Sequence, residues 1–243
     1  MLLGVGAVAG LAGTAGGITS LVSYPALLAV GLSPIRANMT NSVAFVGNWP
    51  GSTLAARPEL EGQGHRLRQL VPVAAAGGVV GTALLLRTPA TVFDRDVPFF
   101  LAAASLALLC QPRLATWRRR HFRGASRSLF SLAFFGVCLY DGYFGAGSGV
   151  MLLALFLVAT DELLPRANAY KNFLLGVSDV ISAAGFAVFG SVDWLAACAV
   201  GLGALLGGTY GPRLTRRLPA GILRVAVALC GFGLAAKLFL APT

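Results

Sequence analysis

Charged residues are scarce in this chain. Asp, Glu, Lys and Arg make up only 12% of its 243 residues, about half the fraction that is typical of soluble globular domains. Hydrophobic residues make up 56% of the chain. This balance excludes an ordinary soluble domain and indicates a membrane protein, with no stretch long enough for a separate soluble domain.

Side chains that bind metals or carry redox chemistry are also few. The two histidines, His65 and His121, lie in polar stretches, and the apolar segments contain no paired acids, HExxH motif or Ser-His arrangement. The glycines of "GAGSG" (145–149) lack the strand, turn and helix of a dinucleotide-binding unit. We therefore expect no enzyme, no metal and no cofactor. Four cysteines lie in apolar segments and form no CxxC pair: Cys110, Cys138, Cys198 and Cys230.

Long apolar segments are what the sequence has in abundance. About 20 consecutive apolar residues span a bilayer as a helix, whereas barrel strands would alternate over roughly ten residues. We expect an all-α polytopic protein of the cell membrane, with up to ten segments if the two that contain glycine clusters each count twice. The eight predicted segments are 1–31, 38–56, 69–86, 97–112, 128–160, 167–190, 192–210 and 220–240.

The net charge of +10 would suggest nucleic acid in a soluble protein, but its distribution suggests otherwise. Six arginines lie in "PRLATWRRRHFRGASR" (112–127), as the positive-inside rule expects of a cytoplasmic loop. A binding tail is the alternative. We expect no nucleic-acid partner and divide the chain into a first transmembrane repeat (1–112), a basic cytoplasmic linker (113–127) and a second repeat (128–243).

The two halves of the chain resemble each other. "GLAGTAGGITSLVSYPALLAVGLSPIRAN" (10–38) is similar to "GYFGAGSGVMLLALFLVATDELLPRAN" (142–168), and internal repeats are common in transporters. We therefore predict two related units. The matched residues are Gly10, Gly13 and Gly17 with Gly142, Gly145 and Gly149, Arg36 and Asn38 with Arg166 and Asn168, and Gly77, Gly81 and Arg87 with Gly203, Gly207 and Arg213.

Segments 1–31 and 128–160 are too long for single membrane helices. A 33-residue helix would measure about 50 Å, against a hydrocarbon core of about 30 Å. Glycine destabilises helices and adopts positive φ readily, so we predict that each segment breaks at its glycine cluster. Each break adds a crossing or a re-entrant hairpin, which would make the two units inverted.

The breaks predict an anion site. N–H groups freed at the start of a half-helix converge on a ligand, and the helix dipole adds about half a positive charge. We place the site at the backbone of Gly16, Gly17, Gly147, Ser148 and Gly149. Close packing of helices through small residues is the alternative explanation of these glycines.

Polar side chains follow each cluster. We expect Asn38, Asn41, Asn168 and Lys171 to complete the site, because charged and polar groups inside a membrane usually face a cavity or a partner. An interfacial position is the alternative for Lys171.

Two acids accompany these residues. Asp141 and Asp179 are candidates for carrying a coupling proton. The alternatives are that Asp141 supports the break beside it and that Asp179 makes a buried structural hydrogen bond.

Three stretches resemble a known family: "GYFGAGSGV", "LLPRANAYKNFLLGVSDVISAAGFAVFGSVDW" and "GALLGGTYGPRLTRRLPAGILRVAV". They are similar to the sulfite exporter TauE/SafE family of membrane anion permeases, and the resemblance extends over essentially the whole chain. It implies a secondary transporter that exports or takes up small sulfur-containing anions, such as sulfite, sulfoacetate or related sulfonates. This chain carries Asp179 where the family commonly has an asparagine.

The sequence thus predicts a secondary transporter for a small inorganic or organosulfur anion, working in the lipid bilayer by alternating access as one unit moves against the other. The oligomeric state stays open, a homo-oligomer included. The alternative is a non-transporting membrane subunit or receptor that packs partner helices through its glycines.

Overall fold

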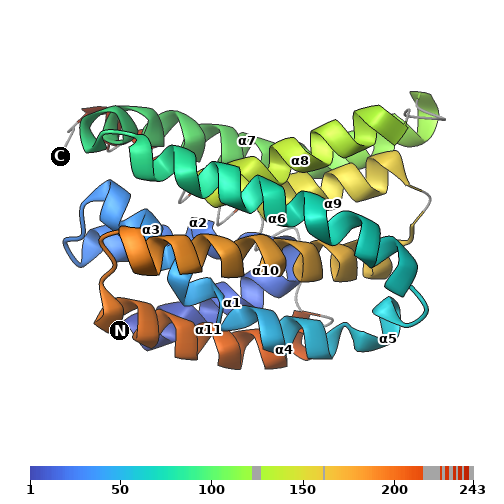
Figure 1. Ribbon diagram of the computed structural model, residues 1–243, viewed down its shortest axis with the longest axis horizontal. Helices are drawn as coiled ribbons and strands as arrows, with labels where there is room; N and C mark the ends of the chain where they lie inside the picture. The colour runs from blue at the N-terminus through green and yellow to red at the C-terminus, as the bar shows by residue number, and fades with distance from the viewer. Residues whose placement is uncertain are drawn as a thin grey trace.

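A computed structural model describes residues 1–121, 127–160 and 162–215 of the protein, together with isolated positions between 225 and 240. All regular elements within these residues are helices, which confirms the predicted all-α class (Figure 1). In chain order they are α1 (Leu2–Gly16), α2 (Thr19–Ala29), α3 (Pro34–Phe45), α4 (Asn48–Ala55), α5 (Arg57–Leu60), α6 (Gly64–Arg87), α7 (Ala90–His121), α8 (Arg127–Tyr143), α9 (Ser148–Ala159), α10 (Leu164–Phe189) and α11 (Trp194–Thr215).

Both overlong segments are broken at their glycine clusters, as predicted. Segment 1–31 contains α1 and α2, which are separated at Gly17 with φ 71°. Segment 128–160 contains α8 and α9, which are separated around Gly145 (φ 74°) and Gly147 (φ 82°). Other L-residues reach this left-handed region at a cost of about 1–2 kcal/mol. Glycine at these positions therefore permits the chain to turn at the breaks.

Segment 38–56, which we expected to be continuous, is divided as well. α3 ends at Phe45 and α4 begins at Asn48. The cause is Pro50, which has no N–H to donate to the carbonyl of Val46 and whose ring would collide with that carbonyl in a continuous helix. This break makes α4 a separate short helix, which packs against α11 and α10.

The basic stretch 113–127 is partly helical. α7 continues through its first part and ends at His121, while residues 122–126 lie outside the described residues. The predicted segments 69–86, 167–190 and 192–210 correspond to α6, α10 and α11. Segment 220–240 is described only at isolated positions. The role of the basic stretch as a linker stays a prediction.

The predicted units interlock through glycines. α1 packs along α11, and α6 packs along α8. A Cβ on Gly207 would overlap the backbone of Ala7 in α1, and a Cβ on Gly81 would overlap the backbone of Leu139 in α8. Ala7 and Leu139 correspond under the same offset that relates the glycine clusters. These matched contacts support the repeat, which otherwise stays a prediction.

The contacts between helices divide all of the described helices except α5 into two bodies. Neither body coincides with one of the two predicted sequence units. The first body contains α1, α2, α3, α4 and α11, and the second contains α6, α7, α8, α9 and α10. The first body thus combines helices of the first predicted unit with α11 of the second, and the second body combines α8, α9 and α10 of the second unit with α6 and most of α7 of the first.

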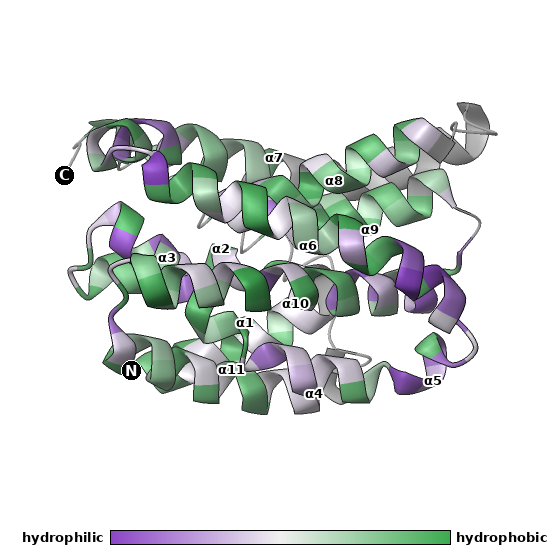
Figure 2. Ribbon diagram, viewed as in Figure 1, coloured by the Kyte–Doolittle hydropathy of each residue, from purple (hydrophilic) through white to green (hydrophobic). Residues whose placement is uncertain are grey.

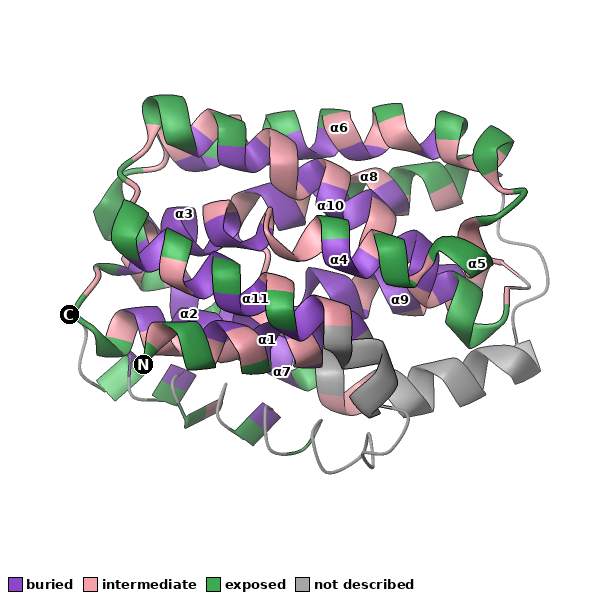
Figure 3. Ribbon diagram, turned by 90° about the horizontal axis from the view of Figure 1, so that it is seen from below, coloured by how far each residue is buried: buried purple, intermediate pink, exposed green. Residues whose placement is uncertain are grey.

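The outer surface suits a bilayer. α6 and α10 are each long and apolar enough to cross a membrane, and five shorter apolar helices accompany them among the described residues. Figure 2 shows hydrophilic residues around α5 and the start of α6 at one end of the molecule, and at the end of α6 at the other. In Figure 3, α6 is exposed along its outer edge and buried along the edge that faces its neighbours. Large exposed side chains such as Val79, Leu132, Leu195 and Leu202 are apolar. The protein is accordingly a multi-pass membrane protein.

Candidate functional site

A cavity of about 60 Å³ lies between the two bodies, beside both glycine breaks. The first body contributes residues of α1 to α4 to its wall, and the second contributes residues of α8, α9 and α10. A buried water occupies roughly 10–15 Å³ of such space, so the cavity has room for roughly four to six waters or for a compact ion. Its polar and charged lining consists of Thr19, Ser20, Ser42, Asn48, Ser52, Asp141, Ser148, Lys171, Asn172 and Asp179.

The two breaks meet backbone to backbone at this cavity. A Cβ placed on Gly149 would lie 2.5 Å from the Cα of Gly17, and the reverse placement is equally crowded. These two glycines correspond to each other in the predicted repeat. Because neither position has room for a side chain, the starts of α2 and α9 lie next to each other at the cavity.

Side chains from the opposite body bind the carbonyl ends of the broken helices. Asn168 in α10 donates its Nδ2 to the carbonyl oxygen of Thr14 at 2.9 Å. Asn38 in α3 donates in the same way to the carbonyl oxygen of Tyr143, also at 2.9 Å. The two asparagines thus satisfy carbonyl groups that helix ends leave without a helical partner.

The amino ends of α2 and α9 lie at the cavity itself. Thr19 and Ser20 begin α2, Ser148 and Gly149 begin α9, and all four residues line the cavity. The first N–H groups of a helix have no acceptor within the helix, and the dipole places positive charge there. Two such ends meeting in one cavity make a positive environment built from backbone.

Lys171 is buried beside these helix ends. Its side chain is 1% exposed, and its Nζ donates to the carbonyl oxygen of Gly13 at 3.1 Å. That hydrogen bond uses one of the three N–H donors of the ammonium group. Lys171 is therefore buried in the interior of the protein, where it lines the cavity.

Asp141 braces the second break. It is 6% exposed, and its Oδ1 accepts a hydrogen bond of 2.6 Å from the Oγ of Ser148 across the turn. Its Oδ2 has no hydrogen-bond partner among the residues that the structure describes. Asp179 lines the same cavity from α10. The cavity thus combines one ammonium group and two carboxyl groups.

The residues that we predicted for the site divide into two groups. Gly17, Ser148, Gly149, Lys171, Asp141 and Asp179 line the cavity.

Of the other five predicted residues, Asn38, Asn41, Gly147 and Asn168 are not among the described residues that line it. Asn38 and Asn168 bind helix carbonyls, as described above. Asn41 accepts a hydrogen bond of 2.6 Å from Ser23 and so supports α2. Gly16 ends α1, and Gly147 is the residue before α9.

Sequence reasoning missed the wall that α3 and α4 supply. Trp49 and Ser52 line the cavity from α4, and Ser42 lines it from α3. The stretch "NWPGS" (48–52) carried a signal, because a proline and polar residues interrupt an otherwise apolar segment. On α10, Gly176 also lines the cavity.

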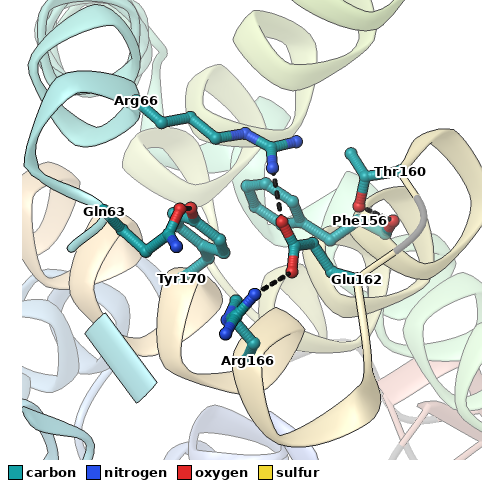
Figure 4. Close-up of polar contacts among 7 residues, drawn as sticks. All are labelled: Gln63, Arg66, Phe156, Thr160, Glu162, Arg166 and Tyr170. Carbon is teal, nitrogen blue, oxygen red and sulfur yellow. Dashed lines mark hydrogen bonds and ion pairs between the residues drawn. The ribbon is translucent and has the colours of Figure 1, made fainter. Parts of the chain in front are cut away.

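Ion pairs hold each body together at its end. In the second body, Glu162 pairs with Arg66 at 2.6 Å and with Arg166 at 3.3 Å, and the hydroxyl of Tyr170 donates to Gln63 at 2.6 Å (Figure 4). These contacts tie the start of α10 to the start of α6.

The first body has a related contact, in which Arg36 at the start of α3 pairs with Asp193 before α11 at 3.4 Å. Arg36 and Arg166 correspond in the predicted repeat. Corresponding ends of the two bodies are therefore both tied by arginine.

Comparisons with known proteins agree with this architecture. The model of the family described as "Sulfite exporter TauE/SafE" matches residues 1–238. A probable membrane transporter protein of Sinorhizobium, ORF9, is 29% identical over 97% of this chain and 90% of its own length. A probable membrane transporter protein of Haemophilus influenzae is 28% identical over 98% and 93%, and YfcA of Escherichia coli K12, also described as a probable membrane transporter protein, is 26% identical over 98% and 88%. No solved structure matches the chain.

Proposed function

Because the chain belongs to the sulfite exporter TauE/SafE family and is a membrane transporter, we propose that it carries a small sulfur-containing anion, such as sulfite, through the central cavity. One observation supports this substrate class above others. The amino ends of α2 and α9 and the ammonium group of Lys171 meet in one buried cavity. Each helix end favours an anion by about 0.3–1 kcal/mol, and by up to about 2 kcal/mol when partly buried.

The two carboxyl groups suggest how transport is driven. Asp141, Lys171 and Asp179 are the titratable side chains among the described residues that line the cavity. With both carboxyl groups ionised they carry a formal charge of −1, which opposes an anion, and protonation of both makes that charge +1. The anion therefore travels with protons on Asp141 and Asp179, and its affinity rises as the pH falls.

Alternating access occurs between the two bodies. The cavity lies at the interface between the bodies. The hydrogen bonds from Asn38, Asn168 and Lys171 to helix carbonyls each join one body to the other. The ion pairs of Glu162 and Arg36, in contrast, lie within the bodies. Sliding of one body on the other exposes the cavity to either side of the membrane while each body keeps its internal packing.

The test of the anion assignment is anion flux into liposomes that contain only this protein. Lys171→Gln keeps an N–H donor for Gly13 but removes the charge. We expect it to lower the apparent affinity for sulfite by roughly 10- to 100-fold, the cost of losing a charged hydrogen bond. Arg68→Met is the matched control, because Arg68 is an exposed cation on α6 and its loss should leave flux unchanged.

Three results would contradict the proposal or a part of it. The anion assignment fails if sulfite, thiosulfate and sulfoacetate do not raise the unfolding temperature of the purified protein while a cation or an amine does. If liposomes move no solute at all, the protein is a non-transporting subunit or receptor. Wild-type affinity in Lys171→Gln would remove Lys171 from the site.

A further inference from the structure

A second pocket lies beside the central cavity, and Trp49 is the residue that the two linings share among the described residues. The outer pocket has a volume of about 440 Å³ and a mostly apolar lining, with an arginine among its residues. Trp49 lines both the outer pocket and the central cavity. The other residues of the outer pocket are Pro50, Thr53, Leu54, Arg57, Leu60 and Phe173.

Trp49 is held in place across the interface of the bodies. Its Nε1 donates to the carbonyl oxygen of Phe173 in α10 at 3.1 Å, and its ring lies 6.0 Å from the ring of Phe173 between centroids. Position 176, one turn further along α10, is a glycine, and a Cβ there would overlap the indole. The indole therefore occupies the space that a side chain at position 176 would fill.

The two volumes differ in what they can hold. The central cavity of about 60 Å³ accommodates a compact oxyanion, whereas an anion with an aromatic ring needs the space behind the indole. That space is apolar, so it would favour a hydrocarbon group. The guanidinium of Arg57 among its lining residues is a second positive charge for an amphiphilic anion.

We propose that Trp49 is the specificity-determining residue of this transporter: its indole closes the central cavity against the outer pocket and restricts the substrate to compact oxyanions, excluding sulfonates that carry a bulky apolar group. This rests on the proposed function, since it assigns the size limit of the same anion site. It also predicts that opening the wall converts the protein to a transporter of arenesulfonates without a change in the charged groups.

The experiment compares sulfite and benzenesulfonate in liposomes that contain the wild type or Trp49→Ala. In the wild type, sulfite flux should not be inhibited by benzenesulfonate. In Trp49→Ala the two volumes join, and benzenesulfonate should compete with an apparent affinity at least about tenfold higher than in the wild type, the effect of burying a ring-sized apolar group.

Two further variants separate specificity from folding. Trp49→Phe keeps an aromatic ring at the wall and should retain most of the selectivity. Leu54→Ala is the matched control, because Leu54 lines the outer pocket without lining the central cavity and is 69% exposed. It should transport sulfite and exclude benzenesulfonate as the wild type does. If Trp49→Ala does not fold, Gly176→Ala tests the same wall by displacing the indole, and it too should admit benzenesulfonate.

The outcomes distinguish this inference from the function on which it rests. A wild type that neither binds nor moves any small anion refutes the proposed function. A wild type that moves sulfite, together with variants at positions 49 and 176 whose selectivity equals that of Leu54→Ala, refutes only the role of Trp49. A wild type that already transports benzenesulfonate also refutes the role of Trp49.

Discussion

Lys171 and Asp141 are both buried at the cavity, but their hydrogen bonds indicate different roles. Lys171 donates to a carbonyl oxygen of the opposite body, whereas Asp141 accepts a hydrogen bond from Ser148 within its own body, and its Oδ2 has no partner in the described part of the chain. A buried charge without a full set of partners is costly. Asp141 therefore both supports the break and offers an oxygen that can take up a proton, so the two roles considered from the sequence are compatible.

The variant Asp141→Asn separates these two roles. Asparagine can still accept the hydrogen bond from Ser148, so the break should persist, but it cannot release a proton. We expect exchange of sulfite for sulfite across the liposome membrane to continue, while accumulation driven by a pH gradient is lost. The measurement is labelled-anion uptake under both conditions. Glu61→Gln, which removes an exposed acid, should behave as the wild type. Accumulation by Asp141→Asn driven by the gradient would exclude this carboxyl group from coupling.

The sequence predicted which side chains would be polar and buried, but it did not predict which groups they would contact. The sequence showed that Asn38, Asn168 and Lys171 are polar groups within apolar segments, and the cost of burying such groups predicted that they face partners. It could not show that the asparagines turn toward helix carbonyls of the opposite body while Lys171 also reaches the cavity. That choice depends on contacts between residues more than 100 positions apart in the chain.

At the scale of elements, the sequence analysis predicted the glycine breaks but not the break between α3 and α4. Segment length and glycine content both indicated interruption at α1–α2 and α8–α9. The length of segment 38–56 fits a single crossing, so only the proline and polar residues of "NWPGS" (48–52) pointed to a separate α4. The consequence was that Trp49, which α4 carries to the cavity wall, was overlooked.

The contact between the two breaks predicts that alanine substitutions at different glycines will differ in their effect on stability. Gly17→Ala places a Cβ at φ 71° against the backbone of Gly149, so it should lower the free energy of unfolding by more than the roughly 1–2 kcal/mol of the left-handed conformation alone. Gly136→Ala in α8 meets no atom within 4 Å and should be neutral or stabilising by about 0.5–1 kcal/mol. Thermal unfolding in detergent measures both. Equal stability of the two variants would mean that the breaks do not touch as described.

For the whole molecule, the interlocking of the units bears on how the transporter moves. α6 belongs to the first predicted unit but packs along α8 of the second, and α11 belongs to the second but packs along α1 of the first. Backbone contact at Gly81 and Gly207 leaves no space for these pairs to slide apart. Movement of one sequence unit against the other, as expected from the sequence alone, would break both interfaces. Movement of the two bodies keeps both.

Distances between spin labels distinguish these two motions. The native cysteines are first replaced, and single cysteines that carry the labels are then introduced at exposed apolar positions. These positions are Val8 on α1, Val79 on α6, Leu132 on α8 and Leu202 on α11. If the bodies move, the distance between positions 132 and 202 changes when sulfite is added at low pH, while the 79–132 and 8–202 distances stay constant.

If the sequence units move, the pattern is reversed, because positions 132 and 202 belong to one unit and the other two pairs each join different units. The 79–132 and 8–202 pairs report on the α6–α8 and α1–α11 interfaces, which correspond in the predicted repeat. Their distances should therefore respond alike, so each pair is an internal control for the other. We expect the first pattern, because glycine packing between α1 and α11 and between α6 and α8 is closer than any side-chain packing could be. Constant distances in all three pairs during active transport would place the gating in smaller elements, and α4 with Trp49 would then be the next to label.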